Sequence, residues 1–289
     1  MKNSYLLLLI FVLFAGCKKE KSRPSNDYFS GSVTVFTDDS FKSVTEALAD
    51  AYMISYPKAK ISVKVQKEDL SLLDLLRDKA RLIVMSRDLS PAEISEYKRI
   101  TDLEYQPARF AADAVIFVVP KNSTRTSISM DEIKAMLNDK SKPLIFDGTN
   151  SGNLNFVAQK FGKKPADLQF SVISGNENVI NQIKDFPDKV GVVSQNTLSR
   201  AYNSKTETLR EQVKVLPVVE GGKVIDVSEQ NVQKMVYPFT RILYFVTREG
   251  NFQIANGFIR FSCTQIGQMV VEKEGLQPYN LYKREVQMH

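Results

Sequence analysis

The fold is decided by the stretch PLIFDGTNSGNLNFVAQKFG, residues 143–162. Its apolar residues 144–146 predict a short buried strand. The small polar residues and two glycines of 147–153 indicate a turn. Residues 154–161 then predict a helix, which Gly162 can end. A strand, a loop and a helix in this order are typical of α/β proteins.

The start of this helix can attract an anion. Ser151 or Asn150 can cap it, and the unpaired N–H groups of its first turn then point out of the loop. Unpaired donors and the positive end of the helix dipole together favour a negatively charged group. A capped helix without any ligand explains the same residues, so both interpretations stay open.

Composition places the chain among folded soluble proteins rather than nucleic-acid-binding ones. Its 289 residues are 43% hydrophobic and 25% charged, and this length allows two domains or one large domain. The formal net charge of +6 comes from 39 basic residues scattered among 33 acidic ones. No aromatic–basic stripe occurs, so we expect no nucleic-acid partner.

Residues 1–16 resemble a lipoprotein signal peptide. Lys2 precedes ten apolar residues, 5–14, about half of what spans a membrane. The following FAGC, residues 14–17, is similar to the bacterial lipobox, with Phe14 instead of the common leucine. This similarity implies cleavage before Cys17 and acylation of its thiol, which would anchor the protein to a bacterial membrane in the cell envelope. Residues 17–30 would then form a flexible tether. An ordinary secretory signal with an incidental cysteine is the alternative.

Histidine and cysteine usage argues against an enzyme. The only other cysteine, Cys263, lies in the apolar run 258–269, which predicts a buried, unreactive thiol. The sole histidine is the last residue, His289. A histidine-based triad or metal cluster is therefore not expected, and we predict neither a metal nor a cofactor.

Strand and helix patterns alternate along the chain. Apolar or alternating runs predict strands at residues 32–36, 61–65, 81–85, 114–120, 144–146, 190–193, 213–219 and 241–246. Helical spacing or capping predicts helices at residues 41–56, 72–79, 91–97, 129–137, 154–161 and 179–185, and one helix or a pair of helices at 251–274. This alternation predicts an α/β fold with a mostly parallel sheet between helices.

Several phrases resemble the phosphate-specific substrate-binding proteins of ABC importers. They are DAVIFVVPKN at 113–122, ISMDEI at 128–133, VGVVS at 190–194, YPFTRILY at 237–244 and VEKEG at 271–275. The resemblance covers about residues 31 to 280, and it implies the type II periplasmic binding protein fold. Two lobes, each a mixed sheet flanked by helices, would close on a ligand through a hinge. Lobe one would be residues 31–112 and 215–289, and lobe two residues 113–214. The implied partners are a small solute, such as inorganic phosphate or another oxyanion, and the permease of an ABC importer or another envelope protein.

The resemblance also implies which loops hold the ligand. The candidate ligand residues are Thr37, Ser40, Ser86, Arg87, Asp147, Ser151, Gly152 and Asn153. Three features depart from the family pattern: Asp147 stands where the family has arginine, Asn153 stands for threonine, and the loop 67–71 has no glycine.

The replacement of the family's arginine by Asp147 matters most for the choice of ligand. An arginine would make charge-assisted bonds to phosphate, whereas a carboxylate repels a dianion by about 1 kcal/mol in water and more in a dry site. Further acids, Asp38, Asp39, Glu68 and Asp69, lie in the neighbouring loops, where they can also serve as helix caps. These changes predict a phosphate affinity weakened at least ~100-fold.

Three hypotheses on function remain. The protein binds phosphate or a related oxyanion weakly, or the same cleft binds another polar or cationic solute. Alternatively, it is an envelope lipoprotein that uses a degenerate binding fold as a protein-interaction module and binds no phosphate. They differ in whether Asp38 and Asp147 face the cleft beside Ser151.

Overall fold

The structure is a computed structural model, and it describes residues 27–280. The predicted signal peptide, Cys17 and the tether up to residue 26 lie outside the described residues. The helices are α2 (Lys42–Ser55), α3 (Glu68–Leu76), α4 (Pro91–Thr101), α5 (Met130–Met136), α6 (Gly152–Lys160), α7 (Asn176–Gln182), α8 (Asn196–Ser199), α9 (Ser204–Gln212), α10 (Glu229–Gln233), α11 (Ile254–Ser262) and α12 (Gln265–Lys273). Short 3-10 turns are η1 (Asp39–Phe41), η2 (Pro165–Asp167) and η3 (Ile183–Asp185).

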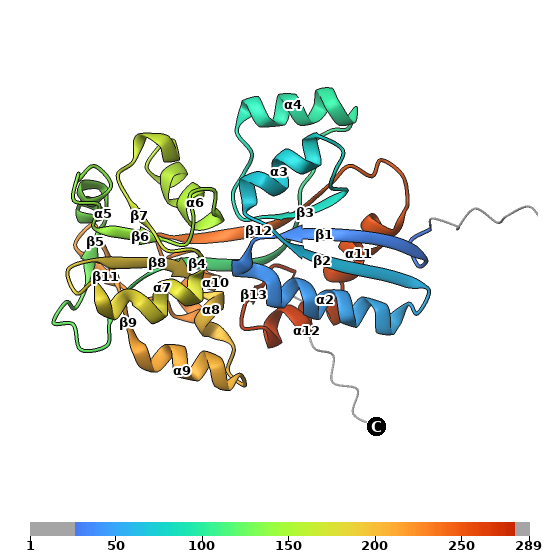
Figure 1. Cartoon of the computed structure of the whole chain (residues 1–289). Coiled ribbons are helices and arrows are strands. Elements are labelled where there is room, and N and C mark those ends of the chain that lie inside the picture. The colour runs from blue at the N-terminus through green and yellow to red at the C-terminus, as the bar shows by residue number, and fades with distance from the viewer. Residues whose placement is uncertain (1–26, 281–289) are drawn as a thin grey trace, which may run out of the picture.

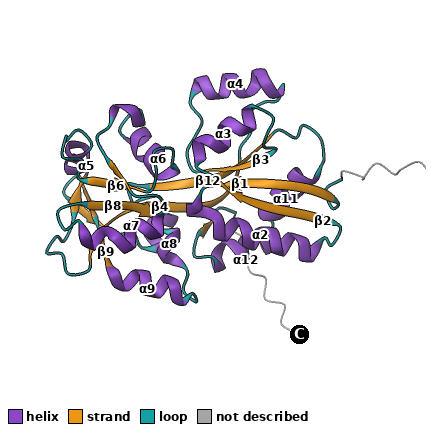
Figure 2. Cartoon of the chain, in the orientation of Figure 1, coloured by secondary structure: helices purple, strands orange, loops and turns teal. Residues whose placement is uncertain are grey.

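The strands form a curled, mixed sheet with helices on both faces (Figures 1 and 2). They are β1 (Gly31–Thr37), β2 (Ala59–Val65), β3 (Leu82–Met85), β4 (Ala108–Pro120), β5 (Ile128–Ser129), β6 (Leu144–Phe146), β7 (Ser171–Val172), β8 (Val190–Ser194), β9 (Val213–Leu216), β10 (Val218–Glu220), β11 (Lys223–Ile225), β12 (Thr240–Thr247) and β13 (Gln277–Pro278). The main order is β2-β1-β3-β12-β4-β8-β6-β7. β1 pairs in parallel with β2 and β3, and β6 with β7 and β8, whereas β12 and β4 run antiparallel to their neighbours.

Strand β4 joins the two halves of the molecule. Its residues 108–114 pair with β12, and its residues 115–120 pair with β8 and β9. Two hydrophobic clusters cover the two faces of β1, β3 and β12, and another surrounds β4, β6 and β8. We call the part around β1, β3 and β12 the first half and the part around β6 and β8 the second half. The region where they meet is the seam.

The helix α3 begins earlier than the sequence predicts. Helical spacing predicts residues 72–79, but α3 starts at Glu68, and Lys67 is its N-cap. Acidic residues in a first helical turn interact favourably with the helix dipole, which explains why Glu68 and Asp69 belong to the helix rather than to a loop. Glu68 is thereby fixed at the seam with a defined orientation.

The boundaries between the lobes stay a prediction. Val218, Val232 and Tyr237 pack in the cluster of the second half, whereas Leu243 and Phe245 pack in the first. We therefore propose that the chain returns to the first half near residue 240 rather than 215.

The described end of the predicted tether, residues 27–30, packs against the first half. Tyr28 contacts the ring of Phe252, with 5.4 Å between ring centroids, and Phe29 contacts Tyr56 at 4.7 Å. Among residues 27–280, no helix has the length and apolar character needed to cross a membrane.

Candidate functional site

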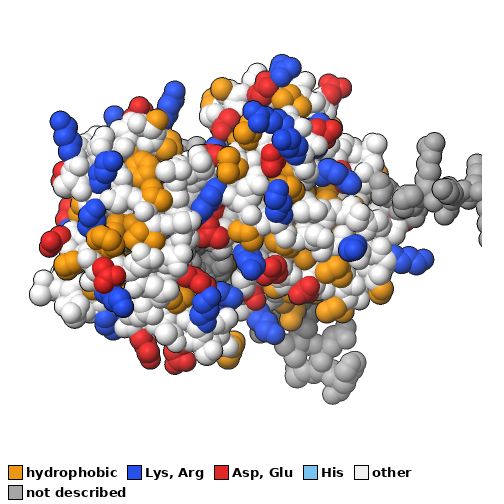
Figure 3. Space-filling view, in the orientation of Figure 1, with side chains coloured by type: hydrophobic (Ala, Val, Ile, Leu, Met, Phe, Trp, Pro, Cys, Tyr) orange, Lys and Arg blue, Asp and Glu red, His pale blue; other side chains and the backbone are white. Residues whose placement is uncertain are grey.

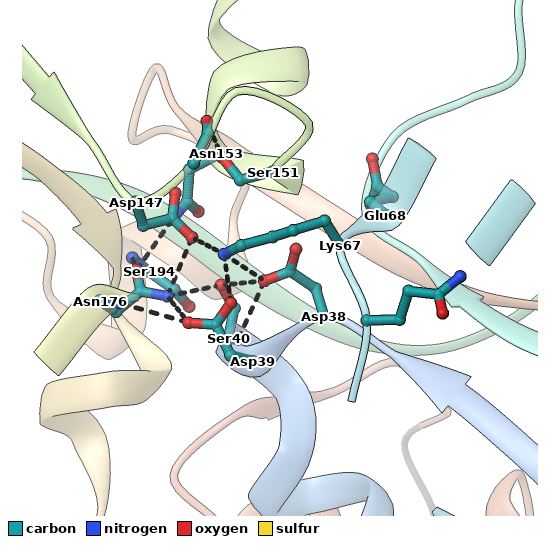
Figure 4. A network of polar contacts seen from close by, with 12 residues as sticks. Asp38, Asp39, Ser40, Lys67, Glu68, Asp147, Ser151, Asn153, Asn176 and Ser194 are labelled. Carbon is teal, nitrogen blue, oxygen red and sulfur yellow. Dashed lines mark hydrogen bonds and ion pairs between the residues drawn. The ribbon is translucent and has the colours of Figure 1, made fainter. Parts of the chain in front are cut away.

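Polar residues from both halves meet at the seam. The carboxyl ends of β1 and β3 face the carboxyl ends of β6 and β8, as is usual where loops after parallel strands form a site. Figure 3 shows acidic and basic side chains together along this seam. Figure 4 shows the residues at its centre, which point toward one another across it.

Three carboxylates surround one ammonium group. Asp38 and Asp147 are buried, Asp39 is partly exposed, and their oxygens lie within 4.8 Å of one another. Lys67 Nζ donates to Asp39 and, at 3.0 Å, to Asp147 Oδ2, and it lies 3.9 Å from Asp38 Oδ1. We call Asp38, Asp39 and Asp147 the acidic cluster. Three carboxylate groups at such distances could also hold a hard metal cation.

The amide of Asn176 ties the acidic cluster across the seam. Its Nδ2 donates to Asp39 Oδ2 at 3.1 Å, to Ser40 Oγ at 2.9 Å and to Asp147 Oδ2 at 3.3 Å. Its Oδ1 accepts from the Ser194 backbone N–H at 2.9 Å. The β1 loop of the first half is thus bonded directly to the second half.

The charges of the cluster perturb one another. Burial and the nearby Asp147 carboxylate raise the pKa of Asp38 well above its ordinary value, against the effect of Lys67. Burial alone would raise the pKa of Asp39, but its ion pair and hydrogen bond with Lys67 outweigh burial and lower it. Burial would likewise lower the pKa of Lys67, but the surrounding carboxylates raise it. Lys67 therefore stays protonated at neutral pH, whereas keeping Asp38 charged is costly.

A second carboxylate site lies at the start of α6. Glu68 Oε2 accepts hydrogen bonds from the Ser86 backbone N–H and from Ser86 Oγ, both at 2.6 Å. A Cβ atom on Gly152 would lie 3.0 Å from Glu68 Oε2 and would collide with Ser86 Oγ. We call the Ser86 donors and the Gly152 backbone at the start of α6 the anion cradle. Burial raises the pKa of Glu68, while Arg87 and the Ser86 hydrogen bonds oppose this.

A buried arginine lies beneath both carboxylate sites. Arg241 and Asp113 are opposite one another on β12 and β4, and both side chains are fully buried. Arg241 Nε and Nη2 donate to Asp113 Oδ2 at 3.0 and 2.8 Å. The guanidinium also donates to Asn153 Oδ1 at 2.8 Å and to Ser86 Oγ at 3.3 Å. Arg241 thus connects β3, β4 and α6.

The structure brings most of the predicted ligand residues to the seam, but they bond to other protein groups. Asn153 Nδ2 donates to Asp147 Oδ1 at 3.0 Å, and Thr37 Oγ1 donates to the Asp38 carbonyl at 3.3 Å. Ser151 Oγ accepts from Leu154 N–H at 3.3 Å and so caps α6. Asp38 and Asp147 face the seam together, which is the arrangement that the hypotheses on function depend on.

Arg87 lies away from the acidic cluster. It bonds to Glu93 at 2.8 and 2.9 Å and to Asp69 at 3.2 Å, and its Nε is 3.5 Å from Glu68 Oε1. Arg87, Asp69 and Glu93 line a groove of about 590 Å³ between α3, α4 and α6. Arg109 also lies elsewhere, 5.9 Å from the ring centroids of Tyr244 and Tyr279.

Sequence reasoning missed Lys67, Asn176 and Arg241. A signal existed for Arg241, because it and Asp113 both lie in the phrases that carry the family resemblance. No comparable signal existed for Asn176, which looks like an ordinary residue at a helix start.

Comparison with known proteins agrees with this fold. The profile of the PBP superfamily domain matches residues 24–265. The chain belongs to the PBP superfamily. Phosphate-binding protein PstS of Pseudomonas aeruginosa is 22% identical over 273 residues, which cover 86% of this chain and 83% of that protein.

Solved structures of other members show the same architecture. A phosphate ABC transporter substrate-binding protein from Clostridium perfringens with bound phosphate aligns with a TM-score of 0.68 at 19% identity, covering 86% of this chain and 99% of that one. An ABC-type phosphate transport receptor from Vibrio cholerae aligns with a TM-score of 0.63 at 16% identity, covering 86% and 100%. These comparisons confirm the predicted similarity to PstS-like proteins and the two-lobed α/β fold. The relatives are substrate-binding proteins rather than enzymes.

Proposed function

We propose that the protein is an extracytoplasmic solute-binding lipoprotein, anchored through Cys17, that delivers a solute to the permease of an ABC importer. Its site between the lobes binds inorganic phosphate weakly or not at all. The observation that carries this proposal is the position of Glu68, whose carboxylate occupies the anion cradle. The superfamily membership and the names of the relatives support solute binding, and nothing in the comparisons favours a protein-interaction module.

The cradle offers a phosphate few free donors. The Ser86 N–H and Oγ, which would bind an oxyanion, already donate to Glu68, and Ser86 Oγ also accepts from Arg241. An entering phosphate must displace this buried carboxylate and then lie near the acidic cluster. Two like unit charges 4 Å apart repel by about 4 kcal/mol near a protein surface. Asp147 stands where the family has an arginine, and the single positive charge of Lys67 is already shared among three carboxylates, so it offsets this repulsion only in part.

Titration calorimetry with inorganic phosphate at neutral pH tests the proposal. We expect the unmodified protein to bind phosphate no better than in the high micromolar range, at least ~100-fold weaker than a micromolar phosphate receptor. Glu68→Ala empties the cradle and should raise phosphate affinity at least ~10-fold, because Ser86 regains free donors. Glu207→Ala, on an exposed face of α9, is the matched control and should change nothing. Low-micromolar phosphate binding by the unmodified protein contradicts the proposal.

The lipid anchor has its own test. Cys17→Ser should give a protein that is either unprocessed or released into the soluble fraction, because serine carries no thiol for acylation. Cys263→Ser is the control: this thiol is half-buried, burial raises its pKa, and its loss should leave membrane fractionation unchanged. A Cys17→Ser protein found on membranes at its mature size rules out the anchor.

A further inference from the structure

Lys67 enters the acidic cluster along a narrow path from solvent. Its side chain is 21% exposed, while its ammonium lies between Asp39 and Asp147. The aliphatic stem runs beside Gly148, where an added Cβ would lie only 2.9 Å from Lys67 Cε. The absence of a side chain at Gly148 therefore leaves room for a straight alkyl chain that leads to the carboxylates.

This ammonium does not satisfy the cluster. It carries one positive charge against three carboxylates, and Asp38 Oδ2 is buried without a hydrogen-bond partner. Figure 4 shows the Asp38 carboxylate directed at the Lys67 side chain. A buried acceptor without a donor is unfavourable. An ammonium that is not tethered to the backbone has the same three N–H donors as Lys67 but can shift to donate to Asp38 Oδ2 as well.

Exchange of Lys67 needs little movement of the backbone. Lys67 is the N-cap of α3 with extended backbone angles, and its side chain makes no capping bond. Rotation about its four-carbon stem can bring the ammonium into solvent, where it is fully hydrated. Glu68, which is only 1% exposed, has no such route.

We propose that the acidic cluster recognises the alkylammonium group of the solute that this protein binds, and that Lys67 fills this place until the solute displaces it. The inference rests on the proposed function as a solute-binding protein and names its substrate class. The group that fits is a primary ammonium on an unbranched chain, because the path beside Gly148 already holds one. Asp38 Oδ2 and the Asn176 and Ser40 side chains complete the polar surroundings.

Chemical rescue tests the ammonium subsite directly. Lys67→Ala removes the stem and the charge and should lower the melting temperature, because the carboxylates then repel one another without a counterion. n-Butylammonium chloride, which has the same four-carbon chain and ammonium group as a lysine side chain, should raise the melting temperature of Lys67→Ala by about 3 °C or more at saturation. n-Butanol and tetramethylammonium chloride should not, since one lacks the charge and the other lacks N–H donors.

Two variants make the rescue specific. Lys67→Ala combined with Asp147→Asn should respond at least ~10-fold more weakly to n-butylammonium, because the carboxylate at 3.0 Å is lost. Lys60→Ala, an exposed lysine on β2, should show no response to the amine. A folded Lys67→Ala protein that n-butylammonium does not stabilise overturns the proposal.

Amine binding to the unmodified protein tests whether a ligand can displace the Lys67 ammonium. In calorimetry, the unmodified protein should bind butane-1,4-diammonium ~10-fold or more weakly than Lys67→Ala does, because the tethered lysine competes for the same place. Lack of any amine binding by the unmodified protein overturns the proposal, since Lys67 would then be a permanent part of the seam. Stronger binding of calcium chloride than of every amine also overturns it, in favour of a metal site. Tight phosphate binding in the same experiments would instead contradict the proposed function.

Discussion

Two cations at the seam face buried carboxylates, but in different ways. Arg241 is fully buried, and its guanidinium divides its donors between Asp113 and two neutral side-chain oxygens. Lys67 is partly exposed and shares one ammonium among three carboxylates. The planar guanidinium presents donors in a fixed geometry that matches its acceptors, so it stays bonded. The ammonium of a lysine is a point charge on a flexible chain, so it can move out into solvent. The difference indicates that Arg241 holds the site together and that Lys67 occupies it.

The strongest test of this contrast is the loss of Arg241. Arg241→Met should lower the free energy of unfolding by about 3–5 kcal/mol, because Asp113 remains buried without its counterion. Urea denaturation followed by circular dichroism measures this. Arg99→Met, whose side chain is 69% exposed on α4, should change stability by less than about 0.5 kcal/mol. A loss below about 1 kcal/mol for Arg241→Met would mean that the ion pair between Arg241 and Asp113 does not hold the structure together.

Removing the charge of Asp38 should raise the stability of the protein, whereas removing Arg241 should lower it. Its pKa is raised in the folded protein by burial and by Asp147, with Asp39 acting in the same direction and Lys67 against it. The stability that a raised acid pKa contributes is present below the unfolded value and is lost as pH rises through the folded value. Asp38→Asn has no such loss, so it should stabilise the protein by on the order of 1 kcal/mol at pH 7.

The decisive measurement is how the difference in stability between Asp38→Asn and the unmodified protein depends on pH. Melting temperatures of the two proteins should converge as pH falls, because unmodified Asp38 then takes up its proton. Asp50→Asn, at an exposed position of α2, controls for the loss of one charge. A constant gap between Asp38→Asn and the unmodified protein from pH 4 to 7 would mean that Asp38 does not titrate in this range.

The smallest effect should come from the rim of the seam. Asn155 Nδ2 donates to Asp69 Oδ1 at 2.7 Å across the two halves, but the Asp69 side chain is 34% exposed. Asn155→Ala should therefore cost only about 1 kcal/mol or less in thermal unfolding. It should change the affinity for butane-1,4-diammonium less than ~2-fold, since it contacts neither cation. If Asn155→Ala lost more stability than Arg241→Met, the contacts at the edge of the seam would matter more than those at its centre, contrary to this prediction.

The sequence predicted the elements of the site better than its contacts. The strand at 144–146 and the Ser151 cap of α6 are confirmed, as is the helix that starts at Pro91. These features depend on local chemistry: apolar runs, capping hydroxyls and the fixed φ of proline. Residues 251–274, predicted as one helix or a pair, form a pair, α11 and α12, which separate where Thr264 caps the second.

The contacts could not be predicted because they join distant residues. Lys67 meets Asp39 and Asp147, which lie 28 and 80 positions away, and Arg241 meets Asp113 from 128 positions away. Periodicity and capping describe neighbours along the chain and contain nothing about such pairs. Assigning residues 67–71 to a loop also hid the fact that Glu68 has one fixed direction at the first turn of α3.

The thirteen residues of β4 have a consequence for folding cooperativity. One end of this strand belongs to the ladder with β12 and β13, and the other to the ladder with β8 and β9. Cutting the chain within β4 would leave each fragment with unpaired backbone donors and acceptors along a buried edge. We therefore expect that neither half folds autonomously, and that calorimetric unfolding occurs in a single transition whose calorimetric and van't Hoff enthalpies agree.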